Sequence, residues 1–206
     1  RIHHQLRREQ PLILLSGKKG VGKSSLLAAG LTPRIETEHV VSLCHVDQKS
    51  LVDALDEVME NVREVHGLEK IPPKDKSKLE EKIAEIQKLQ PSLSGVAKEI
   101  VEQELEHLMR LAGKEHLSFY EQWLSIEKQT GKPLIIILDE LLSDPTGWNH
   151  FRDILIHIFE TNTPPRGKLI LAVGEEVHGP FTETLQQVKF PYAEVFLQPL
   201  TWDGIK

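Results

Sequence analysis

The 206-residue sequence contains only one cysteine, no excess of positive charge and no apolar run of membrane-spanning length. Cys44 cannot form an internal disulfide, so we expect a reducing, cytoplasmic setting and a thiol buried in its apolar stretch. Lys and Arg number 25 against 31 Asp and Glu, and this net charge of −6 offers no electrostatic footprint for nucleic acid or an anionic membrane. Nucleic-acid binding is therefore unsupported, and no membrane partner is expected.

The chain length suits one α/β domain with an inserted subdomain, because two complete domains would leave little chain for each core. The sequence begins at Arg1 rather than Met, and it stops at Lys206 soon after an expected strand. We therefore expect it to be part of a longer protein with flanking domains.

The most informative stretch is residues 11–31, where a short apolar run leads into a turn rich in glycine and lysine and then into a helix-forming segment. The apolar run, residues 12–15, has no polar face, which predicts a strand buried on both sides. The turn matches the spacing G-x-x-x-x-G-K-[ST], in which glycines let successive backbone N–H groups surround an anion. The predicted nucleotide-binding residues are Gly17, Lys18, Lys19, Gly20, Val21, Gly22, Lys23, Ser24 and Ser25.

Each residue at the end of this motif has an expected task. Lys23 is expected to reach the β- and γ-phosphates, and the Ser24 hydroxyl is expected to ligate Mg²⁺. The helix that begins at Lys23 adds its positive dipole end to the same site. A chance turn of glycine and lysine is the competing interpretation, but the flanking strand and helix favour a phosphate-binding loop.

A second chemical landmark follows the apolar run at residues 134–138, which ends in Asp139 and Glu140. A carboxylate at the end of a buried strand can hold Mg²⁺, and a second one beside it can polarise the attacking water. We therefore assign Asp139 to the metal and Glu140, together with Lys23, to catalysis. The competing interpretation is that Asp139 only caps the exit of the strand.

Strand-like and helix-like patterns alternate along the rest of the chain, which predicts a parallel sheet covered on both faces. Ligands bind beyond the carboxyl ends of the strands in such sheets, and both motifs lie there. The helix after the phosphate loop is expected to end at Gly30 and Pro33. The further expected strands are 40–46 and 168–173, both buried, and 195–197, and the further expected helices are 51–66, 118–130, 148–160 and 181–188.

Residues 67–117 differ from the rest because they are rich in Lys and Glu and contain no strand-like run. Two apolar stripes at helical spacing, separated by Pro91, predict an inserted helical hairpin. Such a charged hairpin most often packs one face on its parent domain, and a lid or a partner-binding role is the alternative.

The paired Asp139 and Glu140 resemble the additional-strand, catalytic-glutamate division of P-loop NTPases, in which a strand separates the phosphate-loop strand from the Asp-bearing strand. Within that division, GKSSLLAAGLTPR at residues 22–34 is similar to the G-K-S-S-L-L-x-A-G-L-x-P-x-L stretch of STAND-type signal-transducing NTPases. QPL at residues 198–200 resembles their Gly-x-Pro linker, which implies that Pro199 contacts adenine. The resemblance implies a three-layer α/β P-loop NTPase fold with a five-stranded, mainly parallel sheet in the order 5-1-4-3-2.

The resemblance also implies a function. STAND proteins are ATP-dependent switches that bind ATP or ADP with Mg²⁺. A regulatory region or partner releases the module, nucleotide exchange reshapes it, and it forms a homo-oligomer that activates an effector domain. Flanking regulatory and effector domains are therefore implied partners.

The sequence departs from the family pattern after the fourth strand, where Gly174 and Glu175 replace the usual polar or basic sensor. Arg152 and Arg166 are candidate arginine fingers by position alone, and a solvated surface arginine is the simpler interpretation of each. A missing sensor and finger predict slow ATP turnover by this chain in isolation.

Three other classes of protein are alternatives to a STAND-type switch. The sequence contains no Asn/Thr-Lys-x-Asp run, which a Ras-type GTPase needs to read guanine. A small-molecule or nucleoside kinase would share the phosphate loop and could use the hairpin as its lid, but the sequence contains no acceptor signature. A scaffold that binds nucleotide without hydrolysing it is the third alternative.

Overall fold

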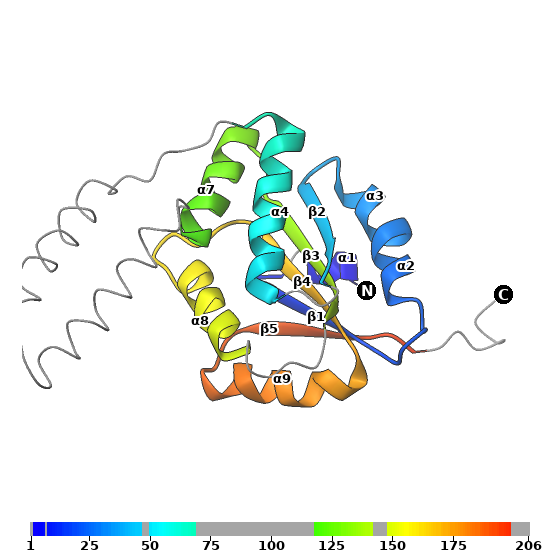
Figure 1. Cartoon of the computed structure of the whole chain (residues 1–206). Coiled ribbons are helices and arrows are strands. Elements are labelled where there is room, and N and C mark those ends of the chain that lie inside the picture. The colour runs from blue at the N-terminus through cyan, green and yellow to red at the C-terminus, as the bar shows by residue number, and fades with distance from the viewer. Residues whose placement is uncertain (1, 7, 47–49, 69–117, 142–147, 199–206) are drawn as a thin grey trace, which may run out of the picture. The chain divides into compact units, whose positions relative to one another are not determined.

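The computed structural model describes the whole chain except residues 1, 7, 47–49, 69–117, 142–147 and 199–206 (Figure 1). All described helices and strands belong to one compact unit, which joins Arg1–Glu69 with Phe119–Lys206. The predicted hairpin at 67–117 lies outside the described residues from 69 onward, and so does Pro199. Both remain predictions.

Five parallel strands form the central sheet, in the order β2-β3-β4-β1-β5. This is the expected order, 5-1-4-3-2, counted from the opposite edge. β4 therefore lies between β1, which leads into the phosphate loop, and β3, which carries Asp139. The strands are β1 (Leu12–Ser16), β2 (Val40–His45), β3 (Leu134–Leu141), β4 (Lys168–Val173) and β5 (Tyr192–Phe196).

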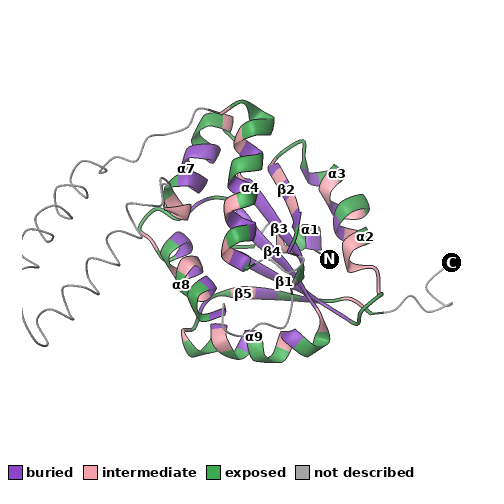
Figure 2. Ribbon diagram, viewed as in Figure 1, coloured by how far each residue is buried: buried purple, intermediate pink, exposed green. Residues whose placement is uncertain are grey.

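The burial of the strands follows their place in the sheet (Figure 2). β1 and β4 are buried at every residue because they have neighbours on both sides and helices on both faces. β2 was expected to be fully buried over 40–46, but the strand ends at His45 and only alternate residues are buried. The reason is its position at an edge of the sheet, where one face is only partly covered. Cys44 in this strand is buried, as expected.

Two apolar clusters cover the two faces of the sheet. Alternate residues of β1 supply both, because successive strand side chains point to opposite faces: Leu12 and Leu14 join one cluster, and Ile13 and Leu15 join the other. The larger cluster is completed by α4 (Leu51–His66), α7 (Phe119–Thr130), α8 (Trp148–Phe159) and α9 (Glu175–Gln187). The smaller one is completed by α1 (Ile2–Gln5) and the helical segment after the phosphate loop.

The sequence predicted that this helical segment ends at Gly30 and Pro33, but it continues to Ile35. It consists of α2 (Lys23–Ser25), the π-helical turn η1 (Leu26–Leu31) and α3 (Thr32–Ile35). In the π turn, the Thr32 N–H and hydroxyl both donate to the carbonyl of Leu27, five residues earlier. Pro33 then falls in the first turn of α3, where its missing N–H is not needed.

Helix α9 was also predicted too short, because it begins at Glu175 rather than at Phe181. Pro180 lies inside the helix, where its missing N–H removes the bond to the carbonyl of the exposed Glu176. Water can satisfy that carbonyl, so the helix passes through the proline.

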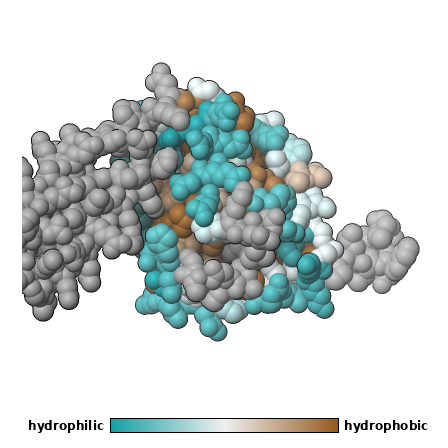
Figure 3. Space-filling view, in the orientation of Figure 1, coloured by the Kyte–Doolittle hydropathy of each residue, from teal (hydrophilic) through white to brown (hydrophobic). Residues whose placement is uncertain are grey.

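In the view of Figure 3, the visible described surface is mostly hydrophilic, and hydrophobic residues show only in small areas. Val65 and Phe196 are the large apolar side chains found exposed among the described residues. None of the described helices is long and apolar enough to cross a membrane.

Candidate functional site

The phosphate-loop motif occupies the turn between β1 and α2, at the carboxyl edge of the sheet (Figure 1). Gly20 and Gly22 have φ angles of 79° and 92°, in the left-handed region that side chains with a Cβ rarely adopt. Gly22 also begins the helix, because its carbonyl accepts the N–H of Leu26 at 2.9 Å. The two glycines therefore set the loop conformation that the motif predicts.

Gly17 has a different reason to lack a side chain. A Cβ atom there would lie 2.6 Å from the carbonyl oxygen of Leu197, just past the end of β5. The Leu197 N–H in turn donates to the carbonyl of Ser16 at 2.8 Å. Leu197 therefore lies against the start of the phosphate loop. The predicted adenine contact, Pro199, follows two residues later in the sequence.

The side chain of Lys23 is held over its own loop. Its Nζ donates to the carbonyl oxygens of Gly17 at 2.8 Å and Lys18 at 3.2 Å. Lys23 and Ser24 are half-buried, whereas Lys18, Lys19 and Ser25 are exposed. The ammonium group thus already lies among the backbone groups that would surround a phosphate, with weak partners that an anion can replace.

The second motif is built on a β-bulge at the carboxyl end of β3. Leu138 pairs with Leu171 and Leu141 pairs with Val173, so Asp139 and Glu140 together oppose a single residue of β4. Glu140 has a φ angle of 61°, which is unusual and unfavourable for a residue with a side chain. The bulge turns two successive carboxylates in different directions: Asp139 is fully buried and Glu140 is exposed.

Asp139 is only partly satisfied in its buried position. Its Oδ1 accepts the N–H of Glu140 at 3.0 Å. Its Oδ2 is buried and accepts no hydrogen bond from the described residues, although Nδ1 of His45 lies 3.4 Å away without the alignment of a hydrogen bond. A buried carboxylate oxygen without a donor is costly unless a cation or an ordered water joins it.

This orphaned oxygen fits the predicted magnesium ion. Mg²⁺ is held through one or two protein oxygens, with waters and substrate phosphates completing its shell. Within the described residues, no group of three or more His, Cys, Asp or Glu side chains could form a metal cage by itself. Asp139 and the Ser24 hydroxyl are the protein oxygens that would hold the ion.

The sheet order places the two motifs at one edge. β1 and β3 are both parallel neighbours of β4, so their carboxyl ends point the same way and are separated by one strand. The space above β4 between the two motifs is therefore where a nucleotide would lie.

The sensor position follows β4, and one candidate arginine finger, Arg152, lies on α8. Gly174 follows β4 and caps α9, and Glu175 and Glu176 are exposed in the first turn of that helix. Arg152 lies on α8, where its guanidinium donates to Asp153 and Asn149.

Arg166 precedes the start of β4, at the amino edge of the sheet, and its side chain donates to the carbonyl of Gly131. The opposite edge of the sheet carries the phosphate loop. Arg166 therefore cannot serve as a finger within its own chain.

His45 is a neighbour of the site that the sequence analysis did not single out. It is the last residue of β2 and pairs with Asp139 in the β2–β3 register. A signal was present, because His45 is a polar residue at the carboxyl end of a predicted strand. The strand order alone, however, does not give the register that brings it beside Asp139.

The fold and these two motifs define a P-loop NTPase. In agreement, a family model described as an AAA ATPase domain matches residues 1–155. The chain belongs to this family and is a nucleotide-binding ATPase domain. A search of curated proteins finds no match.

Proposed function

We propose that this chain is the ATP-binding switch module of a STAND-type signalling or defence protein, and that it hydrolyses ATP slowly. The observation that carries the hydrolytic part is the pair at the end of β3. A buried Asp139 with an orphaned oxygen adjoins an exposed, strained Glu140, one strand away from the phosphate loop. The signalling part is supported by the similarity of residues 22–34 to STAND proteins.

Each proposed role follows from where its side chain lies. The glycines of residues 17–22 allow the loop backbone to curve around the phosphates, and Lys23 exchanges its two carbonyl contacts for the β- and γ-phosphates. When bound by Asp139 and Ser24, Mg²⁺ neutralises charge on the phosphates. Glu140 orients the attacking water and accepts its proton, because its carboxylate is exposed whereas that of Asp139 is buried.

Slow turnover is proposed from the residues around the γ-phosphate position. The turn after β4 supplies Gly174 and the acidic Glu175 instead of a basic sensor. Arg152 is already bonded on its own helix, and Arg166 lies at the opposite edge of the sheet. An arginine finger supplied in trans contributes about 10³ to 10⁵ in rate, so a neighbouring protomer in a homo-oligomer would complete the site.

Binding is tested by titrating the purified chain with ATP, ADP and GTP in the presence and absence of Mg²⁺. We expect Mg²⁺-dependent binding that prefers adenine nucleotides and is largely lost in Lys23→Ala. Lys128→Ala, which removes an exposed lysine on α7, is the matched control. Equal affinity for ATP and GTP, or unchanged binding by Lys23→Ala, would contradict the assignment.

Turnover is tested by phosphate release across a wide range of protein concentrations. A rate far below about ten per second that climbs with concentration supports a switch completed by a second protomer. Fast, concentration-independent hydrolysis would instead indicate a self-contained enzyme.

Adding small-molecule and nucleoside acceptors tests the kinase alternative, because a kinase would transfer the phosphoryl group rather than release it to water. ATP binding without turnover at any protein concentration would favour the third alternative, a scaffold that binds nucleotide without hydrolysing it.

A further inference from the structure

His45 and Asp139 form a pair across the β2–β3 ladder that the proposed chemistry does not yet use. The two residues are opposite each other in the register, at the carboxyl ends of their strands. Their side chains differ in burial, because the imidazole of His45 is 57% exposed whereas the Asp139 carboxylate is completely buried. His45 therefore lies between the solvent and the buried metal-binding carboxylate.

The carboxylate is fixed at one oxygen only. Oδ1 of Asp139 accepts the N–H of Glu140, and the Asp139 carbonyl accepts the N–H of Val46, the residue after His45. The backbones of the two strands are thus joined at this point, which keeps the imidazole beside the carboxylate. Oδ2 has no hydrogen-bond donor among the described residues, and Nδ1 of His45, at 3.4 Å, needs only a small rotation of an exposed ring to supply one.

We propose that His45 is a positioning residue for Mg²⁺ binding, whose Nδ1–H donates to Oδ2 of Asp139 and fixes the rotation of the carboxylate. The inference rests on the proposed function of the site and names a further residue in it. With one donor on each oxygen, the carboxylate keeps lone pairs on both for the metal or its waters. The neutral imidazole provides this donor, so no change of protonation is required.

Outer donors of this kind act by orienting a ligand before the metal arrives. Their removal typically lowers metal affinity by about 10- to 100-fold, although they never touch the metal. Because His45 is largely exposed and contributes little to the core, its removal is expected to affect metal binding more than folding.

The experiment measures ATP affinity by calorimetry over a series of Mg²⁺ concentrations. In His45→Ala, we expect the half-saturating Mg²⁺ concentration to rise about 10-fold, with unchanged affinity for ATP in the presence of a chelator. His45→Asn should restore most of the loss, because its amide N–H can occupy the place of Nδ1–H. His39→Ala is the control, since His39 precedes the same strand and its Nδ1 lies at hydrogen-bond distance, 3.2 Å, from the carbonyl oxygen of Ile35 rather than beside Asp139.

A double-mutant comparison separates positioning from a general structural effect. In an Asp139→Asn background, His45→Ala should have no further effect on the Mg²⁺ requirement, because the group that it positions is changed. The proposal is overturned if His45→Ala leaves the half-saturating Mg²⁺ concentration unchanged. It is also overturned if the substitution lowers the ATP affinity measured with a chelator as much as the ATP affinity measured with Mg²⁺. A parent protein whose ATP binding ignores Mg²⁺ would instead overturn the proposed function, so the two failures are distinguishable.

Discussion

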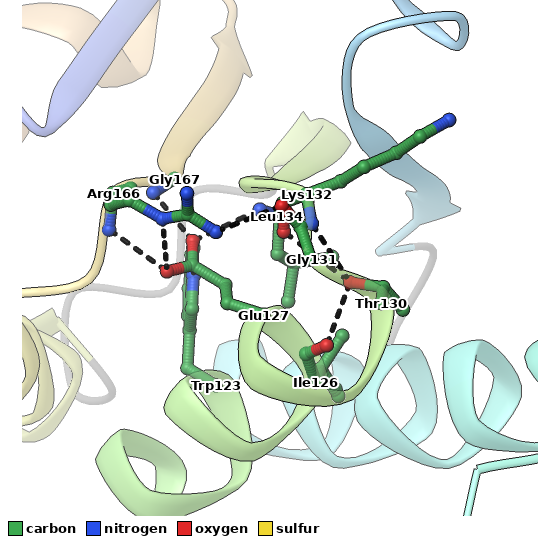
Figure 4. Close-up of polar contacts among 9 residues, drawn as sticks. All are labelled: Trp123, Ile126, Glu127, Thr130, Gly131, Lys132, Leu134, Arg166 and Gly167. Atoms are coloured by element: carbon green, nitrogen blue, oxygen red, sulfur yellow. Dashed lines mark hydrogen bonds and ion pairs between the residues drawn. The ribbon is translucent and has the colours of Figure 1, made fainter.

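The carboxyl edge of the central sheet, where the strands end, and the amino edge, where they begin, differ in how their buried charges are hydrogen-bonded. At the carboxyl edge, one oxygen of the buried Asp139 accepts no hydrogen bond from the described part of the chain, and its neighbour Glu140 has a strained backbone. At the amino edge, the buried Glu127 has a donor on both oxygens (Figure 4). A buried charge can therefore serve the fold or remain available for a ligand, and its hydrogen bonds distinguish the two uses.

Glu127 joins three segments at the amino edge. From α7, its Oε1 accepts the N–H groups of Leu134 at 3.0 Å and Gly167 at 2.6 Å, and Oε2 accepts the N–H of Arg166 at 3.0 Å. The indole N–H of Trp123, one turn earlier, also points at Oε1 at 3.3 Å. This carboxylate therefore supplies acceptors for backbone N–H groups at the starts of β3 and β4 that would otherwise be buried without a hydrogen bond.

Lys168 shows the same principle with a positive charge. Its Nζ donates to the carbonyl oxygens of Arg8 and Gln10, which attaches the N-terminal segment to the start of β4. Burial lowers the pKa of Lys168, because the charged form loses contact with water. The two carbonyls still give the ammonium group specific hydrogen-bond partners, whereas Oδ2 of Asp139 accepts no hydrogen bond from the residues that the structure describes.

The sharpest test of the contrast is Glu140→Gln at the carboxyl edge. Removing a general base typically costs about 10² to 10⁴ in rate, which corresponds to about 3 to 5 kcal/mol in the activation free energy. ATP affinity and the free energy of unfolding should remain near the parental values, because the Glu140 side chain is exposed. Steady-state phosphate release, nucleotide titration and chemical denaturation measure the three quantities. A variant that hydrolyses ATP at the parental rate would exclude Glu140 as the base.

At the amino edge, Glu127→Ala should have the inverse profile. Three backbone N–H groups would lose their acceptor, and breaking a buried charged network of this kind costs about 3 to 5 kcal/mol in the free energy of unfolding. The folded fraction should still bind ATP with parental affinity. Glu160→Ala, at an exposed glutamate, is the control for the loss of one acidic residue. A stable Glu127→Ala protein with weakened ATP binding would show that the two edges are not separate in role.

Sequence patterns were sufficient for the features that depend on neighbours along the chain. The apolar run in β1 and the glycine spacing after it fix a buried strand and a phosphate loop without knowledge of the rest of the fold. The strand order came from the resemblance of Asp139 and Glu140 to a known division, and the sheet confirms it.

Features that depend on pairing between strands were not predictable. The bulge at Asp139 exists only in register with β4, and the approach of His45 exists only in register with β2. Local rules also failed at Gly30 and Pro33, where a π turn allows the helix to continue through residues that usually end one.

Replacing one glycine by alanine at each edge, Gly167 at the amino edge and Gly17 at the carboxyl edge, compares the effect of a steric clash at the two places. At Gly167, a Cβ would lie 1.8 Å from the carbonyl oxygen of Leu134, so Gly167→Ala should cost about 3 kcal/mol of unfolding free energy, mainly by separating β3 from β4. At Gly17, the nearest atom is the Leu197 oxygen at 2.6 Å, and the smaller overlap should cost about 1 kcal/mol. Gly17→Ala should in addition weaken ATP binding, whereas Gly167→Ala should not. Denaturation and nucleotide titration of both variants test this, and equal losses of affinity would contradict it.

The last prediction concerns the cost of the buried Asp139 to the free energy of unfolding of the nucleotide-free protein. Asp139→Asn removes a buried negative charge whose Oδ2 accepts no hydrogen bond from the described residues, and the new amide can donate to Nδ1 of His45 in its other tautomer. We therefore expect the nucleotide-free variant to be more stable than the parent by about 1 kcal/mol, because active sites commonly retain groups that the fold alone would not favour. Magnesium with ATP should reverse the order, since only the parent gains binding energy from the carboxylate. Thermal unfolding of both proteins, with and without Mg²⁺ and ATP, measures this difference. If Asp139→Asn destabilised the nucleotide-free protein as strongly as Glu127→Ala does, Asp139 would belong with the structural charges of the amino edge.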